Sequence, residues 1–407
     1  MSLDQAFNAM FATRAAGPQQ ITNSFLGMSL FGGASKGTLA NVKSAFTISA
    51  FYNGVEQLSN DIAKLPKSIK QKIGTDRVDF IDHPVNYLIA SQPNDMMTAF
   101  DFWKVNVVTV IIKGNSFSRI MRNADTGEVK ALLYLNYEDV QVLKYQNKLY
   151  YKYKGETIDS ADMLHFKHFS FDGIIGVSVI AFAAKQLGVT IDAQSYQQEV
   201  YKDRGLGYGV IESDLAVKKE TKIMIEDGFS AKMASSSKFK VPMLDEGMKY
   251  KSISISPAEA QFLETNKAGV IEVCRWLNIA PHKLKDLNNA NYSNIQQQSI
   301  EHVQDSLLPW IVRMEQEISN KIFTTKEKAS LYVKFNEKSL LRGDLEARKN
   351  YYTAMVYAGI MTRNEARALE DMNGIDGLDE ILQPVNMQAL SIANELIKNT
   401  GNGTSGK

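Results

Sequence analysis

Apolar positions recur every three or four residues in several stretches of the chain, which is the spacing of an α-helix with one buried face. The first such stretch covers residues 48–65, and Pro66 ends it because proline has no N–H to donate to the helical ladder. The same spacing predicts helices over 178–204 and from Pro257 to about residue 278.

The longest helical pattern covers residues 294–322. Apolar residues step through it without interruption from Ile300 onward, and Ser293 with Gln296 forms a capping box at its start. A helix of this length would be a rod roughly 45 Å long. Pro309 lies inside the pattern and predicts a kink there.

A pattern rich in tyrosine and valine fills residues 115–171 and is typical of antiparallel strands. Turn residues divide it, from Asn123 to Gly127 and again at Gln146 and Asn147. The strands are predicted over residues 116–122, 129–135, 140–145 and 149–153.

The C-terminal part predicts one strand over residues 330–335 and then two helices. Gly359 ends the first helix, and Thr362 with Glu365 forms a capping box that opens the second. Both ends of the chain are rich in small polar residues without a period, which predicts a mobile arm and a disordered tail. Strands followed by many helices, without regular alternation, indicate an α+β fold.

Charge limits what the chain can bind tightly. Its 407 residues include 46 Lys and Arg against 45 Asp and Glu, a net charge of +1. A protein that grips duplex DNA needs a clustered excess of positive charge, so we expect any DNA contact to be weak. No apolar run approaches the ~20 residues that span a bilayer, so we expect no membrane partner.

Few residues suggest chemistry. His165 and His168 form an H-x-x-H pattern, but on a strand this spacing points the two side chains to opposite faces, which argues against a shared metal. The glycines of residues 205–209 follow a helix, whereas phosphate-binding glycines follow a strand. The single cysteine, Cys274, lies among apolar neighbours and is expected to pack. We therefore expect no enzymatic activity, no cofactor and no metal site.

Four groups of motifs occur in a fixed order along the chain. They are MLHFKHFS at 163–170 with DGIIGVS at 172–178, DEGMKY at 245–250 with ISPAEAQFLE at 255–264, IAPHKL at 279–284, and YSNIQQQ at 292–298 with LLPWIVRME at 307–315. Together they resemble the HK97-like (lambdoid-type) portal proteins of tailed bacteriophages. Each motif alone is weak, but their order and spacing are specific. Ala280 and the N-terminal arm depart from the family pattern.

This resemblance implies an α+β portal fold with an α/β wing, a helical stem, a small α/β clip, a long wing helix and a helical C-terminal crown. It also implies a closed ring at one capsid vertex that carries double-stranded DNA in and out. Helices packed about 10 Å apart around a DNA-sized bore give roughly twelve subunits. The chain would then reside in the virion after synthesis in the host cytoplasm.

The implied partners are further copies of the chain, the large terminase subunit, the head–tail adaptor, the major capsid or scaffolding protein, and double-stranded DNA bound weakly and without sequence specificity. A ring-forming neck or head–tail connector component is the first alternative, although such adaptors are usually shorter. An enzyme acting on nucleic acid is the second.

The order of elements assigns each part of the expected fold. The assignments are an N-terminal arm over 1–40, a wing over 41–177, stem helices over 178–206 and 257–279, a clip over 207–256, a tunnel loop over 280–293, a long wing helix with a return strand over 294–342, crown helices over 343–390 and a disordered tail over 391–407.

The tunnel loop is the expected DNA-channel site. It is polar and carries little charge, so it can exchange hydrogen bonds with water and phosphate without trapping DNA. Without the resemblance, the same stretch is typical of an ordinary turn before a capped helix. The expected channel residues are Lys283, Lys285, Asn288, Asn289, Asn291, Tyr292 and Ser293.

Overall fold

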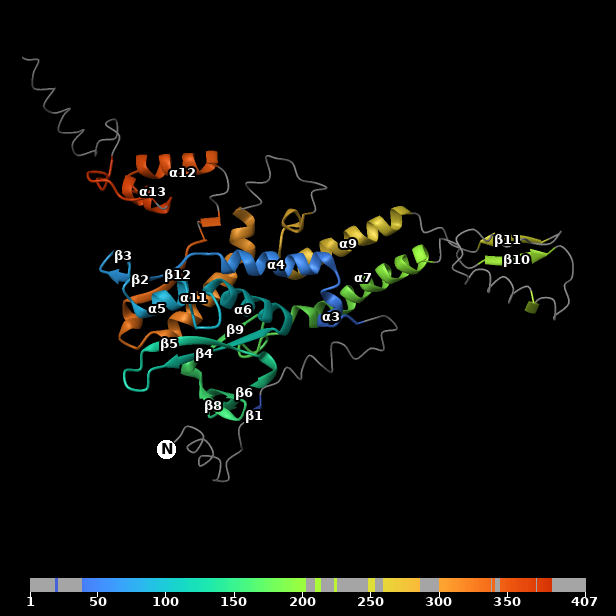
Figure 1. Cartoon of the computed structure of the whole chain (residues 1–407), viewed down its shortest axis with the longest axis horizontal. Helices are drawn as coiled ribbons and strands as arrows, with labels where there is room; N and C mark the ends of the chain where they lie inside the picture. The colour runs from blue at the N-terminus through green and yellow to red at the C-terminus, as the bar shows by residue number, and fades with distance from the viewer. Residues whose placement is uncertain are drawn as a thin grey trace, which may run out of the picture. The chain divides into compact units, whose positions relative to one another are not determined.

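The computed structural model divides the chain into two units, Met1–Phe335 and Asn336–Lys407 (Figure 1). No helix among the described residues is both long enough and apolar enough to cross a membrane. The structure describes residues 19–20, 39–202, 209–213, 223–224, 248–252, 259–285, 300–337, 339–340, 345–370 and 372–382.

Two helices form the centre of the first unit. Helix α4 (Ser49–Ala63) confirms the first predicted helix and buries its apolar face. It packs against α6 (Ala99–Lys113), which was not predicted. Helix α6 is apolar on nearly all sides, because it lies between α4 and a sheet, so its sequence has no amphipathic period. The shorter helix α5 (Pro84–Ala90) contacts α6, and α3 (Val42–Ala45) contacts the later helix α7 (Val179–Lys202).

The predicted strands are confirmed, and they form two antiparallel sheets. One has the order β5-β4-β9, with β4 at Asn115–Arg122, β5 at Val129–Leu135 and β9 at Met163–Lys167. The other has the order β1-β6-β7-β8, with β1 at Gln19–Gln20, β6 at Val140–Tyr145, β7 at Lys148–Tyr153 and β8 at Glu156–Asp159.

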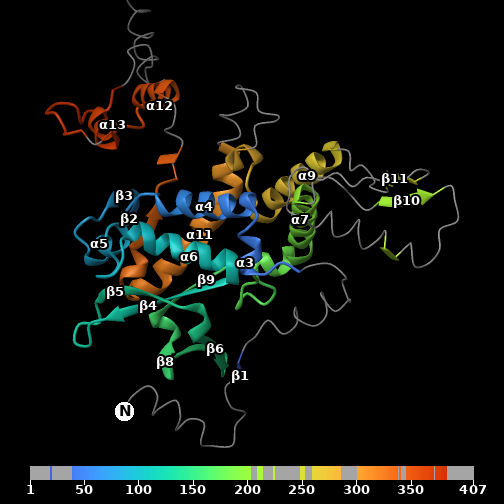
Figure 2. The same ribbon diagram turned by 45° about the vertical axis from the view of Figure 1, so that its right-hand side comes forward.

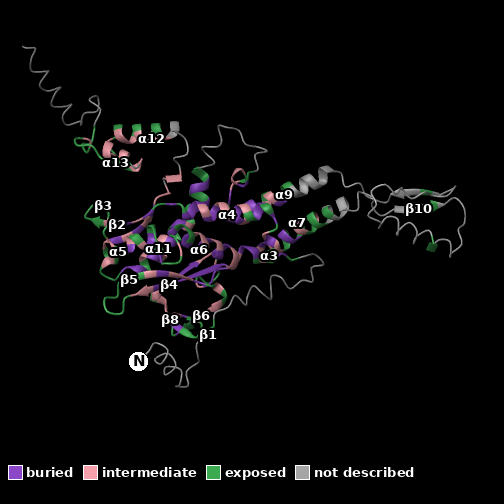
Figure 3. Cartoon of the chain, in the orientation of Figure 1, coloured by how far each residue is buried: buried purple, intermediate pink, exposed green. Residues whose placement is uncertain are grey.

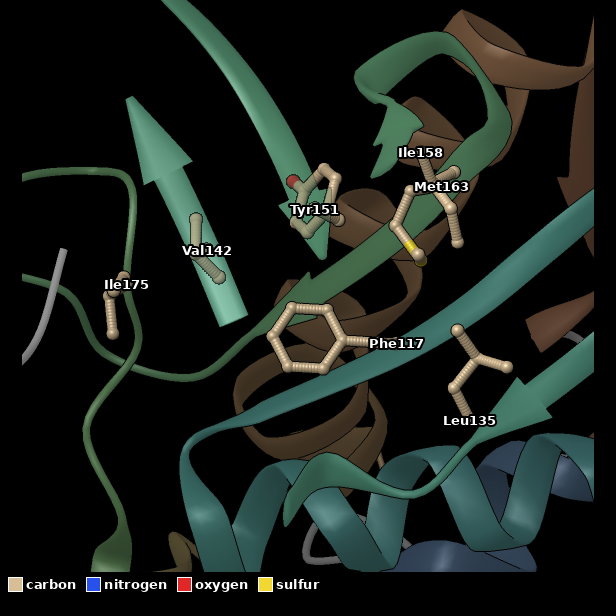
Figure 4. Packing of buried hydrophobic residues seen from close by; sticks show 7 residues of the cluster. All are labelled: Phe117, Leu135, Val142, Tyr151, Ile158, Met163 and Ile175. Carbon is tan, nitrogen blue, oxygen red and sulfur yellow. The ribbon is translucent and has the colours of Figure 1, made fainter. Parts of the chain in front are cut away.

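Both predicted turns of these sheets contain residues in the left-handed conformation. Gly127 has φ 74°, and Gln146 and Asn147 have φ 45° and 63°. The two sheets share one apolar cluster (Figure 4). It comprises Phe117, Leu135, Val142, Tyr151, Ile158, Met163 and Ile175.

A third sheet has the order β12-β2-β3. Strand β12 (Leu331–Phe335) confirms the predicted return strand, and it pairs with β2 (Lys67–Ile73), which turns back into β3 (Asp76–Asp79). Strands β2 and β3 were not predicted. In β2 only Lys67 and Ile69 are buried and its last two residues are exposed, and all of β3 is exposed, so the sequence shows no clear alternation.

Helix α11 (Leu308–Ile322) lies along the open edge of β9 and bonds its backbone through charged side chains. Four residues of helix advance about 6 Å and two residues of strand about 6.6 Å, so every fourth side chain of α11 meets every second residue of β9. The bonds join Arg313 to the carbonyl of Lys167 at 3.1 Å, Glu317 to the N–H of His165 at 3.0 Å, and Lys321 to the carbonyl of Met163 at 3.3 Å.

The same helix also bonds the edge strand β12 of the third sheet. Glu315 accepts the N–H of Phe335 at 2.8 Å, and Ser319 accepts the N–H of Val333 at 3.1 Å. Edge strands expose backbone groups that must find partners. Helix α11 therefore takes the place of an additional strand on both sheets and joins them.

The long predicted helix is continuous over the described residues 300–322, but it contains a π-helical turn that was not expected. Residues His302–Leu307 form this turn, η4, and Pro309 follows it in the first turn of α11. The N–H of Leu308 bonds the carbonyl of Val303, five residues earlier, as in a π-helix. Pro309, the next residue, has no N–H to donate. The start of the predicted helix at 294–299 and its capping box lie outside the described residues.

Two further helices confirm the predictions for 178–204 and 257–278. Helix α7 (Val179–Lys202) and α9 (Glu259–Leu277) pack side by side (Figures 1 and 2), with Gly269 of α9 against Thr190 of α7. Buried residues concentrate in α4, α6 and the sheets and become rare in the second half of α7 (Figure 3). Strands β10 (Gly209–Ser213) and β11 (Met248–Ser252) pair antiparallel.

The second unit contains α12 (Leu345–Tyr357) and α13 (Arg363–Leu369). Gly359 follows α12 with φ 67°, and Thr362 with Glu365 forms the predicted capping box. Arg348 and Tyr352 both donate hydrogen bonds to Glu370, which ties the two helices together.

Candidate functional site: the frame of the predicted channel loop

The structure describes the N-terminal end of the predicted channel loop, residues 280–285, and the predicted helix after the loop from residue 300 onward. Lys283 is half-buried and Lys285 is exposed at its N-terminal end. We call the elements that hold both ends the loop frame; they are α4, the end of α9, η3 (Pro281–Leu284) and η4. The other predicted channel residues lie outside the described residues; they are Asn288, Asn289, Asn291, Tyr292 and Ser293.

The first end of the loop rests on α4 at a glycine. A Cβ added to Gly54 would lie 2.4 Å from Cδ1 of Leu277 and 3.3 Å from Cδ2 of Leu284. Leu277 ends α9 and Leu284 ends η3, and both side chains are buried. The absence of a side chain at Gly54 therefore allows both elements to approach α4. Lys285 then takes a left-handed conformation with φ 64° and ends η3.

The start of the described helix after the loop is tied to α4 by a buried polar pair. Nε2 of His302 in η4 lies 2.9 Å from Oδ2 of Asp61 in α4, and both side chains are almost fully buried. Asp61 also accepts hydrogen bonds from Lys64 at 2.6 Å and from Gln57 at 2.9 Å. These contacts fix η4 on α4.

The hydrogen bonds to Asp61 keep its carboxylate charged. Burial by itself raises the pKa of Asp61, but the hydrogen bonds from His302, Lys64 and Gln57 together lower it more. The resulting pKa lies well below the usual value for aspartate. A buried carboxylate held in this way is a fixed anchor rather than an acid that exchanges protons at neutral pH.

The two histidines of the H-x-x-H pattern have separate environments. Both ring nitrogens of His165 are engaged, Nδ1 with the hydroxyl of Tyr151 at 3.1 Å and Nε2 with Oδ1 of Asn115 at 2.9 Å. Burial lowers the pKa of His165 well below its ordinary value. His168 packs against Trp310, and burial lowers its pKa to about 4. These contacts give both residues a structural role.

Apolar packing and hydrogen bonds among the described residues build the loop frame. Within them, no group of three or more His, Cys, Asp or Glu side chains is placed to hold a metal ion. Cys274 is buried in α9, in accord with its predicted packing role. The loop frame thus presents the two ends of the segment 286–299 from one rigid base.

Sequence reasoning missed the three residues of α4 and η4 that make this base. Gly54 and Asp61 are seven residues apart on one side of the predicted helix, next to its apolar stripe. His302 stands beside Val303 at the start of the apolar pattern of η4 and α11. The sequence does show that these three residues adjoin apolar helix faces. It does not show that they lie close together in the folded chain.

Comparison with known proteins gives one consistent result. The family model described as "Phage portal protein" matches residues 49–371. The portal protein of Enterobacteria phage HK97 is 26% identical over 341 residues, which cover 82% of this chain and 80% of that protein.

Solved structures share the fold. An HK97-family phage portal protein from Corynebacterium diphtheriae matches with a TM-score of 0.57 and 16% identity, covering 76% of this chain and 99% of that one. A chain from the neck of a native gene transfer agent particle, computed with C12 symmetry, matches with a TM-score of 0.50 and 16% identity, covering 84% and 97%. The family match extends over most of the sequence, from α4 to α13, and the chain therefore belongs to the phage portal protein family.

Proposed function

We propose that the chain forms a closed ring at one vertex of a capsid and serves as the channel through which double-stranded DNA is packaged and ejected. The family match across residues 49–371 carries this proposal. The ring contains about twelve subunits, in accord with the C12 symmetry of the gene transfer agent neck that shares this fold. Copies made in the host cytoplasm become part of the virion.

The elements support an assignment of parts. Helices α7 and α9 are the stem, because they are long, lie side by side and connect to the rest of the unit at one end. The antiparallel pair β10 and β11 falls between them in sequence and belongs to the clip. Helices α12 and α13 form the crown, and the sheets with α4, α6 and α11 form the wing.

The clip is the docking site for the large terminase subunit during packaging and for the head–tail adaptor afterwards. The wing is the contact surface for the major capsid or scaffolding protein. The chain itself catalyses no reaction in this scheme, and the packaging energy comes from the terminase. A net charge of +1 supports weak contact with the moving DNA, since a strongly basic channel would bind phosphate too tightly.

The loop held by the loop frame is the DNA-facing element. Replacing Asn288, Asn289 and Asn291 together by Asp adds negative charge to each subunit, which repels phosphate. We expect rings of normal size and at least ten-fold less packaged DNA. A ten-fold effect requires a change of only ~1.4 kcal/mol in the free energy of the contact between loop and DNA. DNA protected from nuclease inside the particles measures the effect.

The matched control replaces the same three residues by Gln, which keeps the loop polar and neutral. This variant is expected to package DNA within about two-fold of the wild type, since it adds no charge. Normal packaging by the Asp variant would show that the loop does not approach DNA. Loss of rings in the Asp variant would show that these residues serve assembly instead.

A further inference from the structure

Three phenylalanine side chains pack on one another at the surface where the chain passes from β9 to α7. The ring centroids of Phe169 and Phe171 are 5.0 Å apart, and the ring of Phe182 in α7 lies 6.4 and 6.2 Å from them. Phe169 is 53% exposed and Phe171 is 58% exposed. We call these three residues the aromatic knob. Apolar residues scattered singly over a surface are normal, whereas these rings form one contiguous patch, which is typical of an interaction site.

Hydrogen bonds within the connection hold the aromatic knob in place. The carboxylate of Asp172 accepts the N–H of Ile174 at 2.7 Å and the N–H of Ile175 at 2.9 Å. The N–H of Val177 bonds back to the carbonyl of Phe169 at 2.7 Å, and Ile175 is buried in the cluster that the two sheets share. The exposed rings are therefore carried by an ordered backbone. Binding through such a preorganised element costs little conformational entropy.

An apolar groove lies on the other side of α7 from the aromatic knob. It encloses about 590 Å³ between the first turns of α7, the start of α3, the end of α6 and η1 (Tyr137–Asp139). At 100° per residue, two groove residues of α7, Ile180 and Ala184, lie about 160° around the helix from Phe182. Most of the lining is apolar and includes Leu39, Val42, Ile112, Tyr137, Ile180 and Ala184. The ion pair between Lys113 and Glu138 borders it.

We propose that the aromatic knob of one copy docks into the apolar groove of the next copy around the ring, which rests on the proposed function. Two different faces on opposite sides of α7 fit a heterologous contact, in which each copy offers its knob to one neighbour and its groove to the other. Contacts of this kind close into rings, whereas pairing of two knobs would stop at a dimer. Pockets of roughly 300–1,000 Å³ accept drug-sized ligands, so the groove is large enough for phenyl rings.

Disulfide formation between copies tests the contact directly. Phe171→Cys chains and Leu39→Cys chains are prepared separately, mixed in reduced form, assembled and oxidised. The native Cys274 is buried and does not compete. We expect a disulfide-linked dimer from the mixture and none from either variant alone, because the bond needs Cβ atoms about 3.5–4.5 Å apart. Met96→Cys is the matched control for Leu39→Cys, since Met96 is exposed but lies outside the groove.

Two results of this experiment would overturn the proposal. The mixture could form rings and yet give no more dimer than the control mixture of Phe171→Cys with Met96→Cys, which would show that knob and groove do not meet. Alternatively, Phe171→Cys alone could give the dimer, which would show that one knob contacts another.

Ring assembly over a dilution series gives a second readout. Phe169→Ser with Phe171→Ser removes two exposed rings, so we expect the chain to keep its fold, as circular dichroism checks. The concentration for half-assembly should rise at least about ten-fold, since buried aromatic anchors dominate most interfaces. Met96→Ser with Phe100→Ser removes two exposed apolar side chains elsewhere and should stay within about two-fold of the wild type.

The outcomes separate the proposal from the function on which it rests. Wild-type rings together with unchanged assembly of the knob variant would overturn the proposal and leave the ring standing. Knob-variant rings that assemble normally but fail to join a capsid would assign the knob to another protein, which also overturns it. A wild-type chain that forms no rings at any concentration would refute the proposed function and this proposal together.

Discussion

Leu307→Asp is expected to leave the chain unable to fold. Leu307 is 0% exposed at the junction of η4 and α11, where the apolar pattern of the sequence places it on the buried face. An aspartate there would bury a charge without a partner, which costs several kcal/mol against a typical total stability of about 5–15 kcal/mol. Soluble yield and the cooperative thermal transition measured by circular dichroism report the loss.

The neighbouring residue provides the control for this substitution. Leu308 has the same side chain but is 36% exposed, so Leu308→Asp lets its carboxylate reach water. We expect Leu308→Asp to fold and to melt within a few degrees of the wild type. A soluble, cooperatively folded Leu307→Asp chain would contradict the burial of this face.

Asp61→Ala is expected to lower the free energy of unfolding by about 3–5 kcal/mol. The substitution removes the acceptor of His302, whose side chain is 2% exposed, and leaves a buried polar ring without its partner. Urea denaturation of the purified chain measures the change. Lys64→Ala is the control, because Lys64 bonds the same carboxylate but is 49% exposed, and such surface pairs contribute only about 0–1 kcal/mol.

The contribution of Asp61 to the stability of the folded chain is expected to decrease at acidic pH. Its pKa in the folded chain lies below the value of ~3.9 for an unfolded aspartate, so its contribution is fully present above that value. The contribution falls as the pH drops below ~4 toward the folded pKa. The stability difference between wild type and Asp61→Ala should therefore narrow between about pH 5 and pH 2. A difference that stays constant over this range would contradict the anchoring role.

Elements with a regular local pattern were predictable from the sequence. Helix α4 shows a clean apolar stripe, the two hairpin turns use residues that tolerate positive φ, and α13 opens with a capping box. Helix α6 escaped prediction because an all-round buried helix loses its period. The π-helical turn before Pro309 was not predicted, because a proline inside a helical pattern indicates a kink and a π-helical turn equally well.

The candidate site was predictable only in part. Motif order assigned Lys283 and Lys285 to the channel loop, which stays a prediction, whereas the contacts that fix η3 and η4 come from distant positions. His302 and Asp61, for example, are 241 residues apart. Such pairs arise from tertiary packing, which decides which polar groups are buried together. One sequence carries no local trace of that pairing.

Electron microscopy of the purified full chain shows directly whether it closes into a portal ring. We predict single particles with a central hole and about twelve-fold symmetry in class averages, as in the gene transfer agent neck of the same fold. The rings should persist across low and moderate salt. A chain that remains monomeric or dimeric under all of these conditions would show that it does not form a portal ring.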